Sequence, residues 1–361
     1  MQPVPHVAAL DAYALAELET GTVSLAQNES LRAPSPNAIA AATQAAHDGA
    51  LYPDPDWRAL RTVISEVYGL DPDGVLCGAG SMELIAALAR TYLAPGSQVL
   101  TTRYAYLFFR TAARMCGAEI SIADEPGLTV DVALILAKVT PATRMVFVVN
   151  PGNPTGTVIP LDELRDLRRR LADDVLLIVD EAYGEFVDPD RPTDGAFDLV
   201  AEGKTVVLRT LSKAYGLAGL RVGWGAFPPE IACDVRKTLT PNNIAAASLA
   251  MAAAAVRDQP YMRETVRLTQ ASRDSFAKAC RANGLAVPSS RANFILLPFA
   301  SADAAGQADQ ALRAAGYSAR GMGGYALPDC LRITIAAPEV MQRVAAHLGD
   351  HLPGAPAGGG A

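Results

Sequence analysis

A single lysine, Lys213, lies in the segment "TLSKAYGLAGLRVGWG", directly after the apolar run 205–208. The hydroxyls of Thr210 and Ser212 precede this lysine, and Arg221 follows it by eight residues among several glycines. A strand, a turn and a solvated lysine would be the plain interpretation. The alternative is that Lys213 is a nucleophilic amine, and that its hydroxyl and guanidinium neighbours hold a phosphate.

Further polar side chains close other apolar runs of the chain. Asn150 ends "MVFVVN" and opens the turn-rich loop "NPGNPTG", which contains Asn153. Asp180 ends "VLLIVD", and Tyr183 follows three residues later. Ligands of open α/β sheets bind at the carboxyl ends of the strands, so we expect these groups to meet at one edge of a sheet.

A glycine-rich turn, "GAGS" (78–81), follows the apolar run "GVLC" and opens a helix. Backbone N–H groups at the start of a helix attract anions, so Ala79, Gly80 and Ser81 are candidate phosphate contacts. Such a loop is often only a tight turn, and the "GAGSME" run lacks the full GxGxxG dinucleotide pattern.

Taken together, these groups match the needs of pyridoxal 5′-phosphate. Lys213 would bind its aldehyde, and Asp180 would keep its ring nitrogen protonated. Asn153 and Tyr183 would donate to its phenolic oxygen, and Tyr104, after the run "SQVLTT", would stack on its ring. The expected phosphate contacts are Ala79, Gly80, Ser81, Thr210, Ser212 and Arg221.

The elements that must position these residues alternate along the chain. Between about 70 and 230, short apolar runs alternate with amphipathic helical stretches, which predicts an α/β fold whose mostly parallel sheet is covered by helices. After about 255 the pattern favours a smaller α+β domain. We expect an N-terminal segment (1–40) over the site or the small domain, a large domain (41–255), a small domain (256–352) and a disordered tail (353–361).

Composition narrows the class of protein. The chain has 361 residues and a net charge of −7, which argues against nucleic-acid binding. Its five cysteines show no CxxC spacing and its four histidines no metal pattern, so we expect no metal site and a reducing cytoplasm. No stretch reads as a secretory signal or a membrane span.

Four motifs in order, "NPGNPTG", "VDEAY", "TLSKAYGLAGLRVG" and "GYALPDCLRIT", resemble the class I/II aminotransferases of pyridoxal-phosphate fold type I. Within that group, with "LYPDP" (51–55) as a further mark, the chain is similar to histidinol-phosphate aminotransferases over roughly residues 20 to 350. The resemblance assigns Lys213, Asp180, Asn153 and Arg221 the cofactor roles given above.

The resemblance also implies partners and substrates. Tyr52 would reach the cofactor phosphate of the other subunit, so the enzyme would be a homodimer with shared sites. Arg332 in "LRIT" would bind the substrate carboxylate, and Arg320 in "SARGMGGY" the phosphate of histidinol phosphate. The resemblance further implies a small-molecule amino donor, an oxo-acid acceptor such as 2-oxoglutarate, and a place in histidine biosynthesis. Lys213 would then move the proton during transamination, as base and then acid.

The N-terminal segment departs from that family's pattern. "QNESLRAPSP" (27–36) replaces the usual "NENPxGPSP", so the turn that covers the substrate differs. Asn28 and Arg32 are the candidate substrate contacts of this segment, although Arg32 has the alternative of being a solvated loop residue. The cradle "GAGSMELI" also lacks the acidic pair that usually follows "GA".

Three other functions remain open from the sequence. The first is an aminotransferase for an aromatic amino acid or another biosynthetic intermediate. The second is a lyase of the same fold, such as a decarboxylase of a phosphorylated amino acid, because such enzymes share the cofactor motifs. The third is the aminotransferase-like part of a transcription regulator, which the acidic net charge disfavours.

Overall fold

The computed structural model describes residues 1–10, 21–188 and 190–350, and the tail expected at 353–361 lies outside them. Its largest sheet has seven strands in the order β2-β8-β7-β6-β5-β3-β4. Only β8 runs antiparallel to its neighbours, so the mostly parallel α/β sheet expected from the sequence is confirmed. The strands are β2 (Val75–Gly78), β3 (Gln98–Thr102), β4 (Glu119–Ala123), β5 (Thr143–Val149), β6 (Leu176–Asp180), β7 (Thr205–Thr210) and β8 (Gly223–Ala226).

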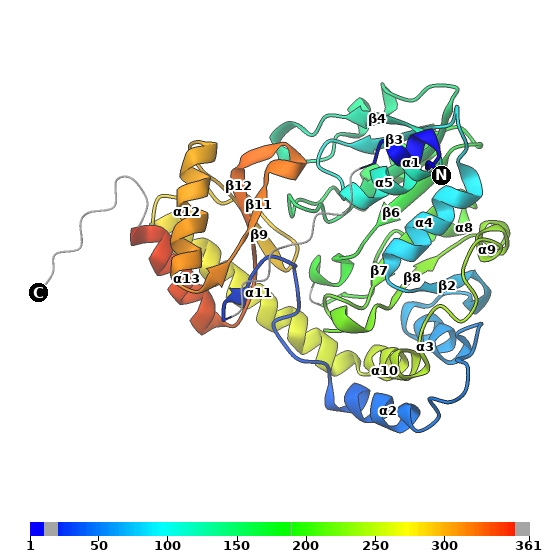
Figure 1. The fold of residues 1–361 in the computed structure, drawn as a ribbon, viewed down its shortest axis with the longest axis horizontal. Coiled ribbons are helices and arrows are strands. Elements are labelled where there is room, and N and C mark those ends of the chain that lie inside the picture. Colours follow the sequence, from blue (N-terminus) through cyan, green and yellow to red (C-terminus); the bar gives the residue numbers. More distant parts are fainter. Residues whose placement is uncertain (11–20, 189, 351–361) are drawn as a thin grey trace, which may run out of the picture.

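Helices cover both faces of this sheet, as Figure 1 shows. Side chains along β5 alternate between two buried clusters, with Phe147 and Val149 in one and Val146 and Val148 in the other. That burial on both sides explains why the central strands read as unbroken apolar runs. The helices of this part are α2 (Pro36–Ala46), α3 (Arg58–Tyr68), α4 (Ser81–Tyr92), α5 (Leu107–Met115), α6 (Val132–Leu136), α7 (Leu161–Arg170), α8 (Phe197–Ala201), α9 (Pro229–Arg236) and α10 (Ala246–Arg257).

A second, smaller part contains the C-terminal strands and has its own buried cluster. Three antiparallel strands in the order β11-β12-β9 form its sheet, and the long helix α11 reaches it from the large part (Figure 1). Its elements are α11 (Gln259–Ala282), β9 (Phe294–Pro298), α12 (Ala302–Ala314), β10 (Tyr317–Ser318), β11 (Arg320–Met322), β12 (Leu327–Thr334) and α13 (Pro338–Asp350).

The described N-terminal residues contact both parts. The short helix α1 (Pro5–Ala8) lies against α5, and β1 (Val23–Ser24) pairs with β10 in a two-stranded parallel sheet. Residues 26–29 then line the large cavity of the molecule before α2 begins. Ser35 caps α2 by accepting a hydrogen bond from the N–H of Ala38, which sets where the segment turns into a helix.

In the described part of the chain, no helix is long and apolar enough to cross a membrane.

Candidate active site

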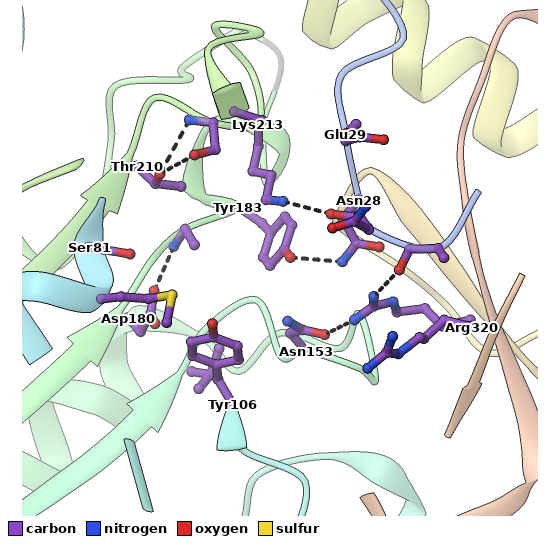
Figure 2. Close-up of a pocket in the computed structure, with 18 of the residues that line it drawn as sticks. Asn28, Glu29, Ser81, Tyr106, Asn153, Asp180, Tyr183, Thr210, Lys213 and Arg320 are labelled. Carbon is purple, nitrogen blue, oxygen red and sulfur yellow. Dashed lines mark hydrogen bonds between the residues drawn. The ribbon is translucent and has the colours of Figure 1, made fainter. Parts of the chain in front are cut away.

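A cavity of about 560 Å³ lies at the carboxyl ends of β5, β6 and β7, where the sequence predicted a site. It opens between the large sheet and the β11–β12 pair, and Figure 2 shows polar side chains entering it from both sides. The cavity brings together eleven of the sequence-predicted residues, namely Asn28, Ser81, Asn153, Asp180, Tyr183, Thr210, Ser212, Lys213, Arg221, Arg320 and Arg332.

Lys213 follows β7 and directs its amine into this cavity (Figure 2). Its Nζ donates a 3.0 Å hydrogen bond to the backbone carbonyl of Gln27. Burial lowers the pKa of Lys213 to about 7, and the positive charges of Arg332 and Arg221 add to this effect while Glu29 opposes it. Much of the amine is therefore neutral near pH 7, which is the form that attacks an aldehyde or accepts a proton.

Asp180 is the last residue of β6, and its buried carboxyl group faces the cavity. Burial raises its pKa to about 7, although the N–H of Ala182 favours the charged form by donating to Oδ1 at 3.0 Å. A carboxylate buried with so little compensation is suited to a cationic N–H partner, because such a partner restores the lost solvation.

Tyr183 and Asn28 also line the cavity and contact each other. Asn28 donates from Nδ2 to the hydroxyl of Tyr183 at 2.8 Å, and its backbone N–H donates to Oγ1 of Thr334. Burial raises the pKa of Tyr183 to about 12, so the phenol keeps its proton. Asn28 thus ties the N-terminal segment to both sheets while it lines the cavity.

The hydroxyls beside Lys213 are already arranged as a group. Thr210 donates to Oγ of Ser212 at 3.0 Å, and its own Oγ1 accepts from the Ser212 N–H. Arg221 faces them from a left-handed backbone conformation. Gly80 has a φ of +76°, which favours glycine, and a Cβ atom on it would lie 2.6 Å from Nη2 of Arg221, so the guanidinium would have to shift.

The glycine-rich turn differs in detail from the expected anion cradle. The N–H of Ala79 donates to Oε2 of Glu83 at 2.6 Å, and Ala79 does not line the cavity. Asn243 donates to the same oxygen at 2.6 Å. Glu83 lies in the first turn of α4 and accepts a hydrogen bond from this amide, so a phosphate would have to replace Glu83 there, and the contact at Ala79 stays a prediction.

Tyr106 lines the cavity beside Tyr183 and Tyr325, whereas Tyr104, which the sequence suggested as the stacking residue, does not line it. Tyr104 packs against a cluster that includes Leu296 and Cys330 of the small part, and its backbone N–H donates to Glu125 at 2.8 Å. The two tyrosines are two residues apart in the turn before α5, so sequence position could not decide which one faces the site.

Two arginines enter from the small sheet. Arg320 and Arg332 are directly opposite each other in the antiparallel β11–β12 pair. Arg332 is buried and donates from Nη1 to Oδ1 of Asn153 at 2.6 Å and from Nη2 to the Ala26 carbonyl at 2.7 Å. Its Nε is buried without a partner, and the two bonds use only two of the guanidinium's five N–H groups, so donors remain for a ligand.

Two expected contacts lie away from the cavity. Arg32 lies 3.9 Å above the ring of Tyr261, donates to Oγ1 of Thr265 on α11 and does not line the cavity, so its role as a substrate contact stays a prediction. Tyr52 is 90 % exposed and does not line the cavity of its own chain.

Sequence reasoning missed some lining residues. Tyr106 and Tyr325 carry the aromatic character of the walls, and Glu29 adds a carboxylate beside Asn28. Tyr325 lies within the "GYALPD" motif and Glu29 within "QNES", so both were inside segments already singled out. Within the described residues, no group of three His, Cys, Asp or Glu side chains could hold a metal ion.

Comparison with known proteins agrees with this geometry. The family model for "Aminotransferase class I and II" matches residues 20–348. The histidinol-phosphate aminotransferase of Rhodospirillum centenum is 41% identical over 336 residues, covering 93% of each chain. That of Jannaschia sp. is 41% identical over 327 residues, covering 90% of each. The crystal structure of the Sinorhizobium meliloti enzyme of that name, in complex with pyridoxal-5′-phosphate, superimposes with a TM-score of 0.89, at 26% identity and 97% coverage of both chains. The chain belongs to the class I and II aminotransferase family.

Proposed function

We propose that this protein is a pyridoxal 5′-phosphate-dependent aminotransferase that acts on histidinol phosphate, with 2-oxoglutarate as the amino acceptor. One observation carries the substrate assignment. Arg320 and Arg332 are directly opposed across two strands and line the same cavity as Lys213. Like charges in that position destabilise a sheet unless an anion lies between or beside them. Burial lowers the pKa of Arg332, and Arg320 adds to the lowering.

The residues present fit the cofactor. Asp180 offers a buried carboxylate for the ring nitrogen, and Asn153 and Tyr183 line the same cavity. The unpartnered Nε of Arg332 and the guanidinium of Arg221 beside Gly80 support a site for anionic groups. Ser81, Thr210, Ser212 and Arg221 would hold the phosphate, and Tyr106 would lie against the ring.

When bound, pyridoxal phosphate supplies an electron sink for the carbon that carries the transferred amino group. Lys213 would bind the cofactor's aldehyde. Its free amine would take the proton from the carbon that carries the amino group and deliver it to the aldehyde carbon of the cofactor. Its lowered pKa makes the amine available as a base near neutral pH. Asp180 holds a proton at the ring nitrogen, because its ionised form is stabilised by that cation in a site without much other solvation.

The two substrates need different contacts. Glutamate has a carboxylate that the guanidinium of Arg332 can bind through two parallel hydrogen bonds. Histidinol phosphate has no carboxylate, and its dianionic phosphate would lie between Arg332 and Arg320. Two guanidiniums on adjacent strands therefore allow one cavity to accept both an amino acid and a phosphorylated amino alcohol.

The exposed Tyr52 supports a homodimer in which this side chain reaches the phosphate of the partner's cofactor. Leu51 beside it is also exposed, so the pair presents an apolar surface. A cytoplasmic location fits five cysteines that are all free in the structure.

A half-reaction screen tests the proposed activity. The purified protein, loaded with cofactor, is mixed separately with histidinol phosphate, glutamate, phenylalanine and O-phosphothreonine. Loss of the bound cofactor's visible absorbance is followed, and the products are identified by mass spectrometry. We expect rapid conversion by histidinol phosphate and by glutamate, each giving its oxo product.

Other outcomes would overturn the proposal in distinguishable ways. Conversion by phenylalanine with histidinol phosphate inert would identify an aminotransferase for aromatic substrates. Release of carbon dioxide from O-phosphothreonine without an oxo acid would identify a lyase.

A further inference from the structure

Outside the cavity lining lies a buried group of charges, Arg209, Glu181 and Glu185, which we call the ion cluster. Arg209 has no exposed surface; its Nε and Nη2 donate to Oε2 of Glu181 at 3.0 and 2.8 Å, and its Nη1 lies 3.1 Å from Oε1 of Glu185. Burial alone disfavours its charge, but the two carboxylates hold the pKa of Arg209 above its usual value. Buried charges of this kind persist only when they are well paired.

Members of the ion cluster are chain neighbours of cavity residues. Glu181 directly follows Asp180, and Arg209 directly precedes Thr210. Successive side chains of a strand point to opposite faces, so the side chains of Arg209 and Thr210 leave β7 on opposite faces of the sheet. The N–H of Glu181 also donates to the Leu208 carbonyl at 2.8 Å. The ion cluster therefore holds the ends of β6 and β7 in register.

Hydrogen bonds between two tyrosine hydroxyls connect the ion cluster to the loop that carries Lys213. Tyr68, the last residue of α3, donates to Oε1 of Glu185 at 3.1 Å. A phenol has a single proton, so Tyr215 must be the donor in the 2.9 Å bond between the two tyrosine hydroxyls. Gln259, at the start of α11, donates to Tyr215 at 3.2 Å. Tyr215 therefore donates to Tyr68, and Tyr68 donates to Glu185.

Tyr215 connects these hydrogen bonds to the catalytic loop. It lies two residues after Lys213, in a turn where the N–H of Gly216 donates to the Lys213 carbonyl at 3.2 Å. Tyr215 and Tyr68 are buried, and neither lines the cavity. Burial raises the pKa of Tyr68 well above its usual value, so its proton remains available for the bond to Glu185.

We propose that Tyr68 is a positioning residue for Lys213, because its one hydroxyl joins the ion cluster at the ends of β6 and β7 to the loop that carries the lysine. This inference rests on the proposed function, since it assigns Lys213 its reaction. Without the hydroxyl, Tyr215 loses its acceptor and Glu185 loses a donor inside the core. A displacement of the reacting amine by a fraction of an ångström then slows the reaction without changing substrate contacts.

The test compares Tyr68→Phe with a matched control, Tyr317→Phe. Tyr317 is equally buried in the small part, and its hydroxyl accepts a 2.9 Å bond from Nε of Arg343. Both changes remove one buried hydroxyl and keep the ring, so the stability effect of losing a hydrogen bond is shared. Only Tyr68 is connected to the Lys213 loop.

We expect Tyr68→Phe to lower kcat about tenfold and to leave the KM for glutamate within about twofold. A second readout needs no turnover. Pyridoxal phosphate is added briefly to the cofactor-free protein at a series of pH values, borohydride traps what has bound, and mass spectrometry quantifies label on Lys213. Its pH midpoint should rise by about half a unit or more in Tyr68→Phe, because a displaced amine regains water.

Two further variants complete the test, namely Tyr215→Phe and the double variant that combines it with Tyr68→Phe. Tyr215→Phe replaces Tyr68→Phe in the test if the latter does not fold. If both hydroxyls act through one path, the double variant should match the stronger single variant rather than add the two effects. The proposal is wrong if Tyr68→Phe and Tyr215→Phe change only the melting temperature, as Tyr317→Phe does. Failure of the wild-type protein to bind the cofactor at Lys213 would instead overturn the proposed function.

Discussion

Arg332 of the small sheet donates a 2.6 Å hydrogen bond to Asn153 in the loop after β5 of the large sheet. The bond joins the residue expected to bind the substrate to one expected to contact the cofactor. A second bond, from Arg332 to the Ala26 carbonyl, brings in the N-terminal segment. One guanidinium therefore fixes the relative positions of three segments that are far apart in the sequence.

The two arginines should separate the two substrates. Arg320→Ala should lower kcat/KM for histidinol phosphate about 100-fold, because a charge-assisted contact to phosphate is worth roughly 2–3 kcal/mol. The same variant should change kcat/KM for glutamate by less than about fivefold. Arg332→Ala should impair both substrates. Steady-state kinetics with each substrate measure this, and equal losses on both substrates in Arg320→Ala would remove its phosphate role.

Lys213→Ala should abolish both the visible absorbance of bound cofactor and turnover, because no other amine lines the cavity among the residues described. Lys278→Ala is the control, since Lys278 is exposed on α11. Spectra and activity of the two variants, prepared side by side with added cofactor, are compared. Full activity in Lys213→Ala would contradict the assignment.

Tyr104 and Tyr106 are the two candidates for the residue that stacks on the cofactor ring: the sequence suggested Tyr104, and the structure places Tyr106 at the cavity. Tyr106→Ala should weaken cofactor binding about tenfold or more, since stacking and burial of an aromatic ring contribute about 1.5 kcal/mol or above. Tyr104→Ala should affect melting temperature more than cofactor affinity, because Tyr104 packs against the small part. Equilibrium titration with pyridoxal phosphate decides between them, and the reverse order would restore Tyr104 as the stacking residue.

Asp180 should make the stability of the cofactor-free protein pH-dependent. Its pKa rises from 3.8 to about 7 on folding, so between these values the folded state retains a proton that the unfolded state releases. Stability is therefore full below about pH 4 and falls as the pH rises toward 7, by up to about 4 kcal/mol.

Asp180→Asn lacks this titrating group. The free energy of unfolding of this variant, relative to that of wild type, should therefore rise between about pH 4 and pH 7. Urea unfolding at several pH values measures the difference, with the exposed Asp48→Asn as control. Parallel curves for wild type and Asp180→Asn would contradict the raised pKa.

Tyr52 should act across subunits. Mixing Tyr52→Ala with Lys213→Ala subunits should produce hybrid dimers in which one of the two sites combines a native Tyr52 with a native Lys213. We expect activity to reappear after mixing at up to about a quarter of the wild-type level, the statistical share of such sites. Activity that stays at the level of the separate variants, with dimers present in sedimentation, would exclude the shared site.

Much of the fold and the site could be predicted from local pattern. Buried parallel strands need unbroken apolar runs, and polar residues that end such runs must meet at the carboxyl edge of the sheet. Asp180, Thr210 and Lys213 follow this rule, so their types and positions sufficed to place them together. The motifs around these residues are specific because each strand end must carry the residue type that one part of the cofactor requires.

Other features depended on contacts between distant segments. Whether Tyr104 or Tyr106 faces the cavity depends on how the turn before α5 packs against the small part. Arg32 binds α11 because Tyr261 and Thr265 lie there, more than 200 residues away in the chain. Ala79 contacts Glu83 because the first turn of α4 brings that carboxylate back to its N–H. Spacing along the chain determines which residues share a strand end, whereas only tertiary packing determines which partner a polar side chain finds.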